Sequence, residues 1–131
     1  MNLLLDTQAL LWWKAGSSRL GRRARREIER GAGTVRVSAA SAWEMAIKSL
    51  TGRLKLVEPL DRWMPGQLER DGFLMLSVSV DHAIAVAALP DHHQDPFDRL
   101  LIAQARIEGL TIVTADAAFD DYDVLVLDAQ K

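Results

Sequence analysis

Apolar and polar residues follow two alternating patterns along the 131-residue chain. Short runs of consecutive apolar residues, partly β-branched, are typical of strands buried in a parallel sheet. Between them lie longer segments in which apolar residues recur every three or four positions, as on one face of a helix. The short runs predict five strands, at residues 2–5, 34–37, 73–76, 110–113 and 124–127. The longer segments predict helices at residues 7–14, 18–31, 42–52, 59–72, 80–89 and 96–109.

Residues that favour helix ends mark several of these boundaries. Asp95 is suited to cap the helix that follows it, Pro96 fits the first helical position because its missing N–H has no partner there, and Gly109 fits the end. The candidate caps of three other helices are Ser17 or Ser18, Ser38 or Ser41, and Ser79. Strands that alternate with helices predict a parallel sheet covered on both faces. We therefore expect one α/β domain over residues 1–131, a three-layer α/β/α sandwich with a roughly five-stranded parallel sheet.

The composition narrows the class of protein. Apolar residues make up 49% of the chain, which is enough for a substantial core. The chain has no cysteine, which excludes a disulfide framework and a thiolate zinc site. Asp6 interrupts the apolar N-terminal run, and no uncharged run approaches the ~20 apolar residues that span a bilayer. We expect a soluble, cytoplasmic protein without a membrane partner.

Charge is distributed unevenly along the chain. Residues 1–80 contain 13 Lys and Arg against 8 Asp and Glu, whereas residues 81–131 contain 3 against 10. The predicted helix over residues 18–31 is strongly basic, with arginines at positions 22, 23, 25, 26 and 30. These arginines form either a solvated helix face or a surface that contacts phosphate or a partner. A basic part beside a group of acids is compatible with binding a polyanion, and with surface solvation alone.

Four acidic residues occupy comparable places in the predicted fold. Asp6 follows the first strand and Asp116 the fourth, while Asp98 lies in the first turn of the helix that begins at Pro96. Glu44 lies near the start of a helix among apolar neighbours, where an ionised group needs a partner. Open parallel sheets carry their sites at the carboxyl ends of the strands, so all four acids are expected to face one crevice. Clustered carboxylates repel each other unless hard cations such as Mg²⁺ or Mn²⁺ neutralise them, and such sites cleave phosphodiesters.

Each of these acids also has a purely structural interpretation. An N-cap Asp95 followed three residues later by Asp98 is an ordinary arrangement at a helix start, where negative charge is favourable. Polar residues such as Asp6 and Asp116 are common directly after strands. Spacing alone therefore leaves both interpretations open, and the agreement among the four positions favours a shared site.

Other catalytic or metal-binding patterns are missing or incomplete. His92 and His93 lie in a predicted loop beside the acids, but no spaced acid or cysteine completes a transition-metal site. We expect these histidines in a solvated or substrate-facing loop. The chain has neither a Gly-x-Ser-x-Gly elbow nor a Gly-rich phosphate loop, which argues against a serine hydrolase and a P-loop nucleotide site.

Four segments carry a resemblance to a known family through their order and spacing. They are residues 4–12, 41–48, 95–105 and 113–116, and the block Asp95-Pro96-Phe97-Asp98-Arg99 is the most distinctive. Together they resemble the PIN-domain toxins of the VapC kind, over essentially the whole chain. The resemblance implies an Mg²⁺- or Mn²⁺-dependent endoribonuclease, the toxin half of a bacterial toxin–antitoxin pair, which acts on RNA, usually forms a homodimer and is inhibited by a VapB-like antitoxin.

The resemblance also assigns roles to individual residues. It implies that the acidic residues that hold the metal and carry catalysis are Asp6, Glu44, Asp98 and Asp116. It implies supporting hydroxyl positions at Thr7 and Thr114. Asp95 belongs to the motif, although helix capping is its better-supported role. Arg99 is expected either to touch phosphate or to be an exposed helix arginine.

A non-catalytic protein of the same architecture is the alternative, either a Mg²⁺-binding signalling module or an RNA-binding or scaffold protein. A receiver-like module would have adjacent acids near the first strand and a lysine after the last. Here only Asp6 follows the first strand, and Lys131 is merely terminal. Metal binding without nuclease activity on any RNA would favour the alternative.

The tryptophans are candidates for two different roles. The chain has four, at positions 12, 13, 43 and 63. Aromatic side chains are preferred anchors at protein interfaces, and they are equally common in cores. The sequence leaves open which of them belong to the core and which could contact an antitoxin.

Overall fold

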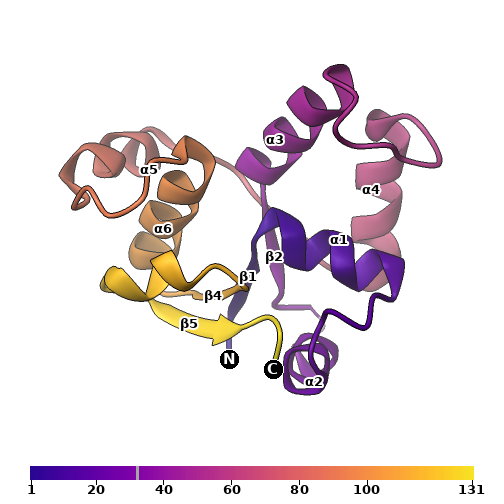
Figure 1. Cartoon of the computed structure of the whole chain (residues 1–131), viewed down its shortest axis with the longest axis horizontal. Helices are drawn as coiled ribbons and strands as arrows, with labels where there is room; N and C mark the ends of the chain where they lie inside the picture. The colour runs from indigo at the N-terminus through magenta and orange to yellow at the C-terminus, as the bar shows by residue number, and fades with distance from the viewer. Residues whose placement is uncertain (32) are drawn as a thin grey trace.

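The computed structural model describes residues 1–31 and 33–131, and its elements follow the predicted alternation of strands and helices (Figure 1). The strands are β1 (Leu3–Leu5), β2 (Arg36–Ser38), β3 (Leu74–Leu76), β4 (Thr111–Thr114) and β5 (Leu125–Asp128). The α-helices are α1 (Thr7–Ala15), α2 (Arg22–Arg30), α3 (Ala39–Leu50), α4 (Leu60–Asp71), α5 (Val80–Ala85) and α6 (Pro96–Glu108). Two short 3₁₀ helices are η1 (Val86–Ala88) and η2 (Ala117–Asp121). None of these described helices has both the length and the apolar character of a membrane span.

The five strands form one parallel sheet in the order β3-β2-β1-β4-β5. The central strand β1 pairs on one side with β2 and on the other with β4, so that Leu5 lies opposite both Val37 and Val113. The chain first builds the sheet outward from β1 to β3 and then returns to add β4 and β5 on the other side. The direction of winding therefore changes between β1 and β4, where doubly wound sheets open a crevice at the carboxyl ends of the strands.

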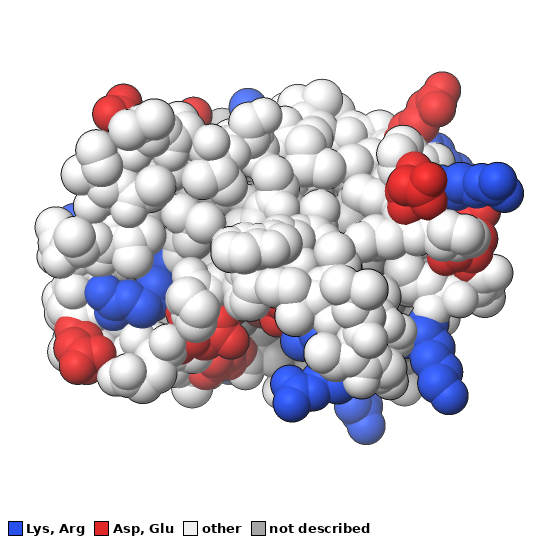
Figure 2. Space-filling view, turned by 90° about the horizontal axis from the view of Figure 1, so that it is seen from above, with Lys and Arg blue, Asp and Glu red and all other residues white. Residues whose placement is uncertain are grey.

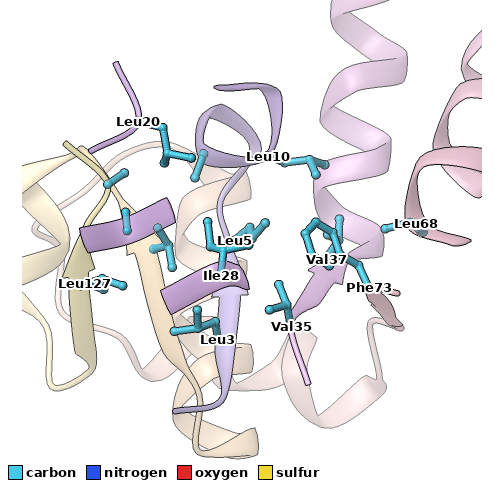
Figure 3. Packing of buried hydrophobic residues seen from close by; sticks show 14 of the residues in the cluster. Leu3, Leu5, Leu10, Leu20, Ile28, Val35, Val37, Leu68, Phe73 and Leu127 are labelled. Carbon is cyan, nitrogen blue, oxygen red and sulfur yellow. The ribbon is translucent and has the colours of Figure 1, made fainter. Parts of the chain in front are cut away.

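Helices cover both faces of the sheet, which explains why β1 is a continuous apolar run. All three of its leucines are fully buried, and alternate residues point to opposite faces. Leu3 and Leu5 join the hydrophobic cluster that includes Ile28 of α2 (Figure 3). Leu4 joins a second cluster with Ile102 of α6. The predicted three-layer α/β/α sandwich with a five-stranded parallel sheet is confirmed.

Helix α2 begins later than predicted, and neither Ser17 nor Ser18 caps it. The N-cap residue is Gly21, and no side chain accepts a hydrogen bond there. The N–H of Gly21 instead donates to the carbonyl of Ala129 at 2.8 Å. A Cβ atom at Gly21 would lie 2.2 Å from the backbone carbon of Lys131, so the close approach of the C-terminal segment requires glycine. A contact between distant parts of the chain thus sets this boundary.

Most of the other predicted caps are confirmed. Ser38, one of two candidates, caps α3 by accepting from the N–H of Ala40 at 3.0 Å, and Ser79 caps α5. Asp95 caps α6, which ends at Gly109 with φ +69°. These caps fix where each helix leaves the sheet, and therefore where the acidic side chains lie.

Candidate active site

A cleft of about 370 Å³ opens beside the residues that follow β1 and β4, at the place where the direction of winding changes. Five carboxylate residues from four segments line it, together with Thr7 and Lys48: Asp6, Glu44, Asp95, Asp98 and Asp116. Figure 2 shows this end of the molecule from above, with acidic side chains gathered in a recess near its lower margin and basic side chains on either side of them. The structure therefore brings together the four acids that the sequence places far apart.

Asp6 is fixed by the junction of β1 and α1. Its backbone N–H donates to the carbonyl of Val113 at 3.1 Å, which continues the pairing of β1 with β4. Its side chain caps α1 by accepting from the N–H of Ala9 at 2.8 Å, and the residue is only 7% exposed. Burial raises the pKa of Asp6 to about 6, although hydrogen bonds from Thr114 and Ala9 favour its ionised form. The charges of Glu44 and Asp116 raise this pKa further.

Glu44 has the partners that a buried carboxylate needs. It projects from α3 and is 8% exposed. The hydroxyl of Thr7 donates to Glu44 Oε1 at 2.6 Å. Lys48, one helical turn later, places Nζ 2.8 Å from Glu44 Oε2. Thr7 thus lies beside an acid as expected, whereas Lys48 was not predicted; its spacing of four residues from Glu44 was the signal for it.

The sequence left open whether Asp95 and Asp98 serve as helix caps or as acids of the cleft, and the structure gives them different contacts. Asp95 Oδ1 accepts hydrogen bonds from the N–H groups of Phe97 (2.8 Å) and Asp98 (3.2 Å), so Asp95 caps α6. The return bond of a capping box is not made, because the N–H of Asp95 donates to Nδ1 of His93 at 3.1 Å. Burial, together with the charge of Asp95, raises the pKa of Asp98 to about 7. Asp98 therefore lines the cleft as an acid that capping does not explain.

Asp116 lies at the more open side of the cleft. It follows β4 and caps η2, since its Oδ1 accepts from the N–H of Ala118 at 2.9 Å. Its own N–H donates to the hydroxyl of Thr114 at 3.1 Å, so Thr114 also lies beside an acid as expected. The Asp116 side chain is 44% exposed. Its second oxygen, Oδ2, faces the cleft and lies 2.9 Å from Nε2 of His93.

His93 enters the acid cluster, so the expectation of a solvated position is wrong for this residue, and a substrate-facing role stays a prediction. Its Nε2 lies 2.9 Å from Asp98 Oδ2 and 2.9 Å from Asp116 Oδ2. The three side chains place possible ligand atoms within 4.8 Å of one another. His92, by contrast, is exposed as expected. The path of the loop brings His93 to Asp98 and Asp116. Spacing along the sequence does not determine that path.

Arg99 is half-buried, so the expectation of an exposed helix arginine is wrong; it does not line the cleft, and contact with phosphate stays a prediction. Its guanidinium donates to backbone carbonyls in the segment between α5 and α6, at 2.9 Å to Pro90, 3.1 Å to Val86 and 3.3 Å to Leu89. A further bond reaches the carbonyl of His93 at 3.4 Å. Arg99 therefore holds the loop that carries His93, and both of its terminal guanidinium nitrogens donate to protein groups.

The basic helix α2 lies at the end of the molecule away from the cleft, near the N-terminus of β1 (Figure 1). Within it, Arg25 stacks over the ring of Trp13 at 5.7 Å and donates to the carbonyl of Ser17 at 3.1 Å. Arg30 lies 3.7 Å from Glu27. The α2 arginines are thus not part of the acidic cleft, and a role in partner contact stays a prediction.

The four tryptophans divide between core and surface. Trp63 is buried, while Trp12 and Trp13 pack half-buried against the same cluster. Trp43 on α3 is 61% exposed, and its ring meets that of Phe97 edge-on at 5.1 Å. Trp43 is therefore the tryptophan best placed to contact another molecule.

Comparison with known proteins identifies the relatives of this arrangement. Residues 3–125 match the family described as PIN domain. The chain is 34% identical over 114 residues to Ribonuclease VapC22 of Mycobacterium tuberculosis (strain ATCC 25618 / H37Rv), which covers 87% of this chain and 86% of that protein. Its fold is similar to that in the crystal structure of VapBC2 from Rickettsia felis bound to a promoter DNA fragment, with a TM-score of 0.71, 17% identity and 98% of each chain covered. It is also similar to a toxin-antitoxin complex from Klebsiella pneumoniae, with a TM-score of 0.64, 18% identity and 97% of each chain covered.

Proposed function

The chain belongs to the PIN-domain family, and from this premise we propose that it is a metal-dependent endoribonuclease, the toxin component of a type II toxin–antitoxin pair. One observation carries the proposal: Asp6, Glu44, Asp98 and Asp116 converge in a single cleft. The name of the Mycobacterium tuberculosis relative, a ribonuclease, supports the reaction. The proposed functional unit is one domain comprising residues 1–131.

The acidic cleft fits a divalent cation. Carboxylate oxygens are the ligands that Mg²⁺ and Mn²⁺ prefer. Burial is the main cause of the raised pKa values of Asp6 and Asp98, and neighbouring carboxylates add to it; a cation bound beside these acids would favour their ionised forms. We therefore assign the binding of Mg²⁺ or Mn²⁺ to the four acids Asp6, Glu44, Asp98 and Asp116. Such an ion lowers the pKa of water and stabilises charge on phosphate oxygens.

The surrounding residues hold these acids in position. The α1 cap and the β1–β4 pairing fix Asp6, and the hydroxyl of Thr7 orients Glu44. Lys48 neutralises part of the charge of Glu44 and is itself 41% exposed at the cleft, where its ammonium is available to an RNA phosphate. The four acids thus supply the metal site, and Lys48 supplies positive charge for the substrate backbone.

A cognate antitoxin of the VapB kind is the protein partner that this assignment requires. An Arg or Lys of the antitoxin that enters the cleft would satisfy the charge of the acids in place of metal. Exposed apolar residues on α3 and α5, namely Trp43, Ile47, Leu50, Val80 and Ile84, provide surface for protein contacts. The middle of the face in Figure 2 is likewise largely uncharged. We expect a homodimer that binds the antitoxin.

Incubation of the purified chain, free of antitoxin, with cellular RNA tests the reaction. With Mg²⁺ or Mn²⁺ we expect discrete fragments, and EDTA should abolish their formation. Cleavage that persists in EDTA would contradict metal dependence, and metal binding without cleavage of any RNA would favour a non-catalytic module. Expression of the chain alone should arrest growth, and co-expression with the adjacent open reading frame should restore it and yield a stable complex.

A further inference from the structure

The loop between η1 and α6 delivers one side chain, that of His93, into the acidic cleft. The imidazole is held between two of the four acids, with Nε2 at 2.9 Å from both Asp98 Oδ2 and Asp116 Oδ2. Its side chain is 15% exposed, and the ring meets that of Phe119 edge-on at 5.8 Å. His93 is therefore a packed part of the cluster.

The hydrogen bond at the other ring nitrogen identifies what His93 offers to the acids. The N–H of Asp95 donates to Nδ1 at 3.1 Å, so Nδ1 presents a lone pair. The hydrogen of the neutral ring is then on Nε2, which becomes a donor to both carboxylates and has no lone pair for a metal. In this orientation His93 is a hydrogen-bond donor to the two acids and not a metal ligand.

The backbone of the loop is held independently of the metal-binding acids. Arg99 donates to the carbonyls of Pro90 and His93, at 2.9 and 3.4 Å. The hydroxyl of Tyr122 donates to Pro90 at 2.9 Å and accepts from the N–H of His92 at 3.1 Å. Since these bonds fix the main chain, the imidazole can leave the cluster by side-chain rotation alone.

We propose that His93 competes with the metal ion: its Nε2–H hydrogen-bonds Asp98 Oδ2 and Asp116 Oδ2, and the ring must leave before a divalent cation can use both of these oxygens. This inference rests on the proposed function, because it assumes that the four acids bind the ion. His93 is a positioning residue that acts through Asp98 and Asp116. It stabilises the fold when no metal is bound and weakens the affinity for metal, because the ion must displace the hydrogen bond that the single Nε2–H shares between two charged acceptors.

Calorimetric titration of the full chain with Mn²⁺, after removal of metal with EDTA, tests the proposal. His93→Ala should bind Mn²⁺ about tenfold more tightly than the native chain, which corresponds to about 1.4 kcal/mol. In EDTA the same variant should melt about 5 °C lower, because the acids lose their link. His93→Gln, whose amide N–H can replace the donor, should move both values back toward the native ones. His92→Ala, in the same loop but with its ring against Tyr122 and outside the acid cluster, is the matched control and should bind Mn²⁺ as tightly as the native chain.

Equal or weaker binding of Mn²⁺ by His93→Ala would overturn the proposal, and weaker binding would make His93 a ligand. Failure of both the native chain and His93→Ala to bind Mn²⁺ would also overturn it. Cleavage of RNA is measured on the same preparations. A chain that cleaves RNA with Mn²⁺ while His93→Ala binds no tighter contradicts only the role of His93. A chain that binds Mn²⁺, more tightly in the variant, but cleaves no RNA contradicts only the proposed function.

Discussion

Replacing Asp98 by Asn should stabilise the metal-free protein while removing its function. Burial and the charge of Asp95 raise the pKa of Asp98 from 3.8 to about 7, a difference that corresponds to at most about 4 kcal/mol against the ionised form. The neighbouring carboxylates share this effect and the side chain is 21% exposed, so we expect about 2 kcal/mol. Asn keeps the shape of the side chain and can still accept a hydrogen bond from His93. The substitution therefore removes mainly the unfavourable charge.

The gain should depend on pH in a definite direction. Because the folded-state pKa of Asp98 lies above the unfolded value of 3.8, the folded chain retains a proton between about pH 4 and pH 7 that the unfolded chain has lost. The stability of the native chain therefore falls as the pH rises through this window. Asn carries no such proton, so the advantage of Asp98→Asn should be near zero at pH 4 and complete at pH 8.

Urea unfolding in EDTA, followed by tryptophan fluorescence at pH 4, 6 and 8, measures both effects. Asp123→Asn, which removes an exposed acid outside the cleft, is the control and should change the free energy of unfolding by less than about 0.5 kcal/mol. Added Mn²⁺ should stabilise the native chain and not Asp98→Asn. Unchanged or lower stability of Asp98→Asn at pH 8, or a gain that does not vary with pH, would refute the electrostatic argument.

Three further substitutions test the supporting residues. Asp95→Asn keeps the cap of α6 and should retain RNA cleavage within about tenfold of the native rate; a loss as large as that of Asp98→Asn would make Asp95 a ligand. In Arg99→Lys, the lysine ammonium cannot reach all the carbonyls that the guanidinium contacts. We expect the free energy of unfolding to fall by about 2 kcal/mol and residues 86–95 to become more sensitive to protease. Native-like resistance to protease would contradict the role of Arg99. Thr7→Val removes the donor to Glu44 and should lower the cleavage rate about tenfold with the helical circular dichroism unchanged; an unaltered rate would show that Thr7 does not orient Glu44.

The sequence predicts the layered fold because its signals are local. Buried strands must be apolar on both faces, as in Leu3–Leu5, and residues such as Ser79 and Asp95 cap helices through bonds within three positions of themselves. The start of α2 was predicted wrongly because its first N–H groups bond to the distant C-terminal segment. Local patterns determine an element only where no long-range contact replaces them.

The candidate site divides in the same way. The sequence could place the four acids together because parallel strands end at one edge of the sheet. Asp6 and Asp116 follow the paired strands β1 and β4, so the sheet topology alone brings these two residues close together. The contacts of His93 and Arg99 depend on how the loop between η1 and α6 folds back over α6. No periodicity encodes that path. The metal-binding and catalytic roles of the acids stay predictions.

The rate of RNA cleavage with Mn²⁺ by Asp116→Asn, compared with that by Asp120→Asn, tests the central claim most directly. Asp116 caps η2 and Asp120 lies within it, and Asn can still act as a cap at position 116. Of these two acids, only Asp116 lines the cleft with Asp6, Glu44 and Asp98. We predict that Asp116→Asn lowers the rate by at least about 100-fold, while Asp120→Asn stays within about twofold of the native chain. Native rates for both variants would contradict the assignment of the acidic cleft as a metal-dependent ribonuclease site.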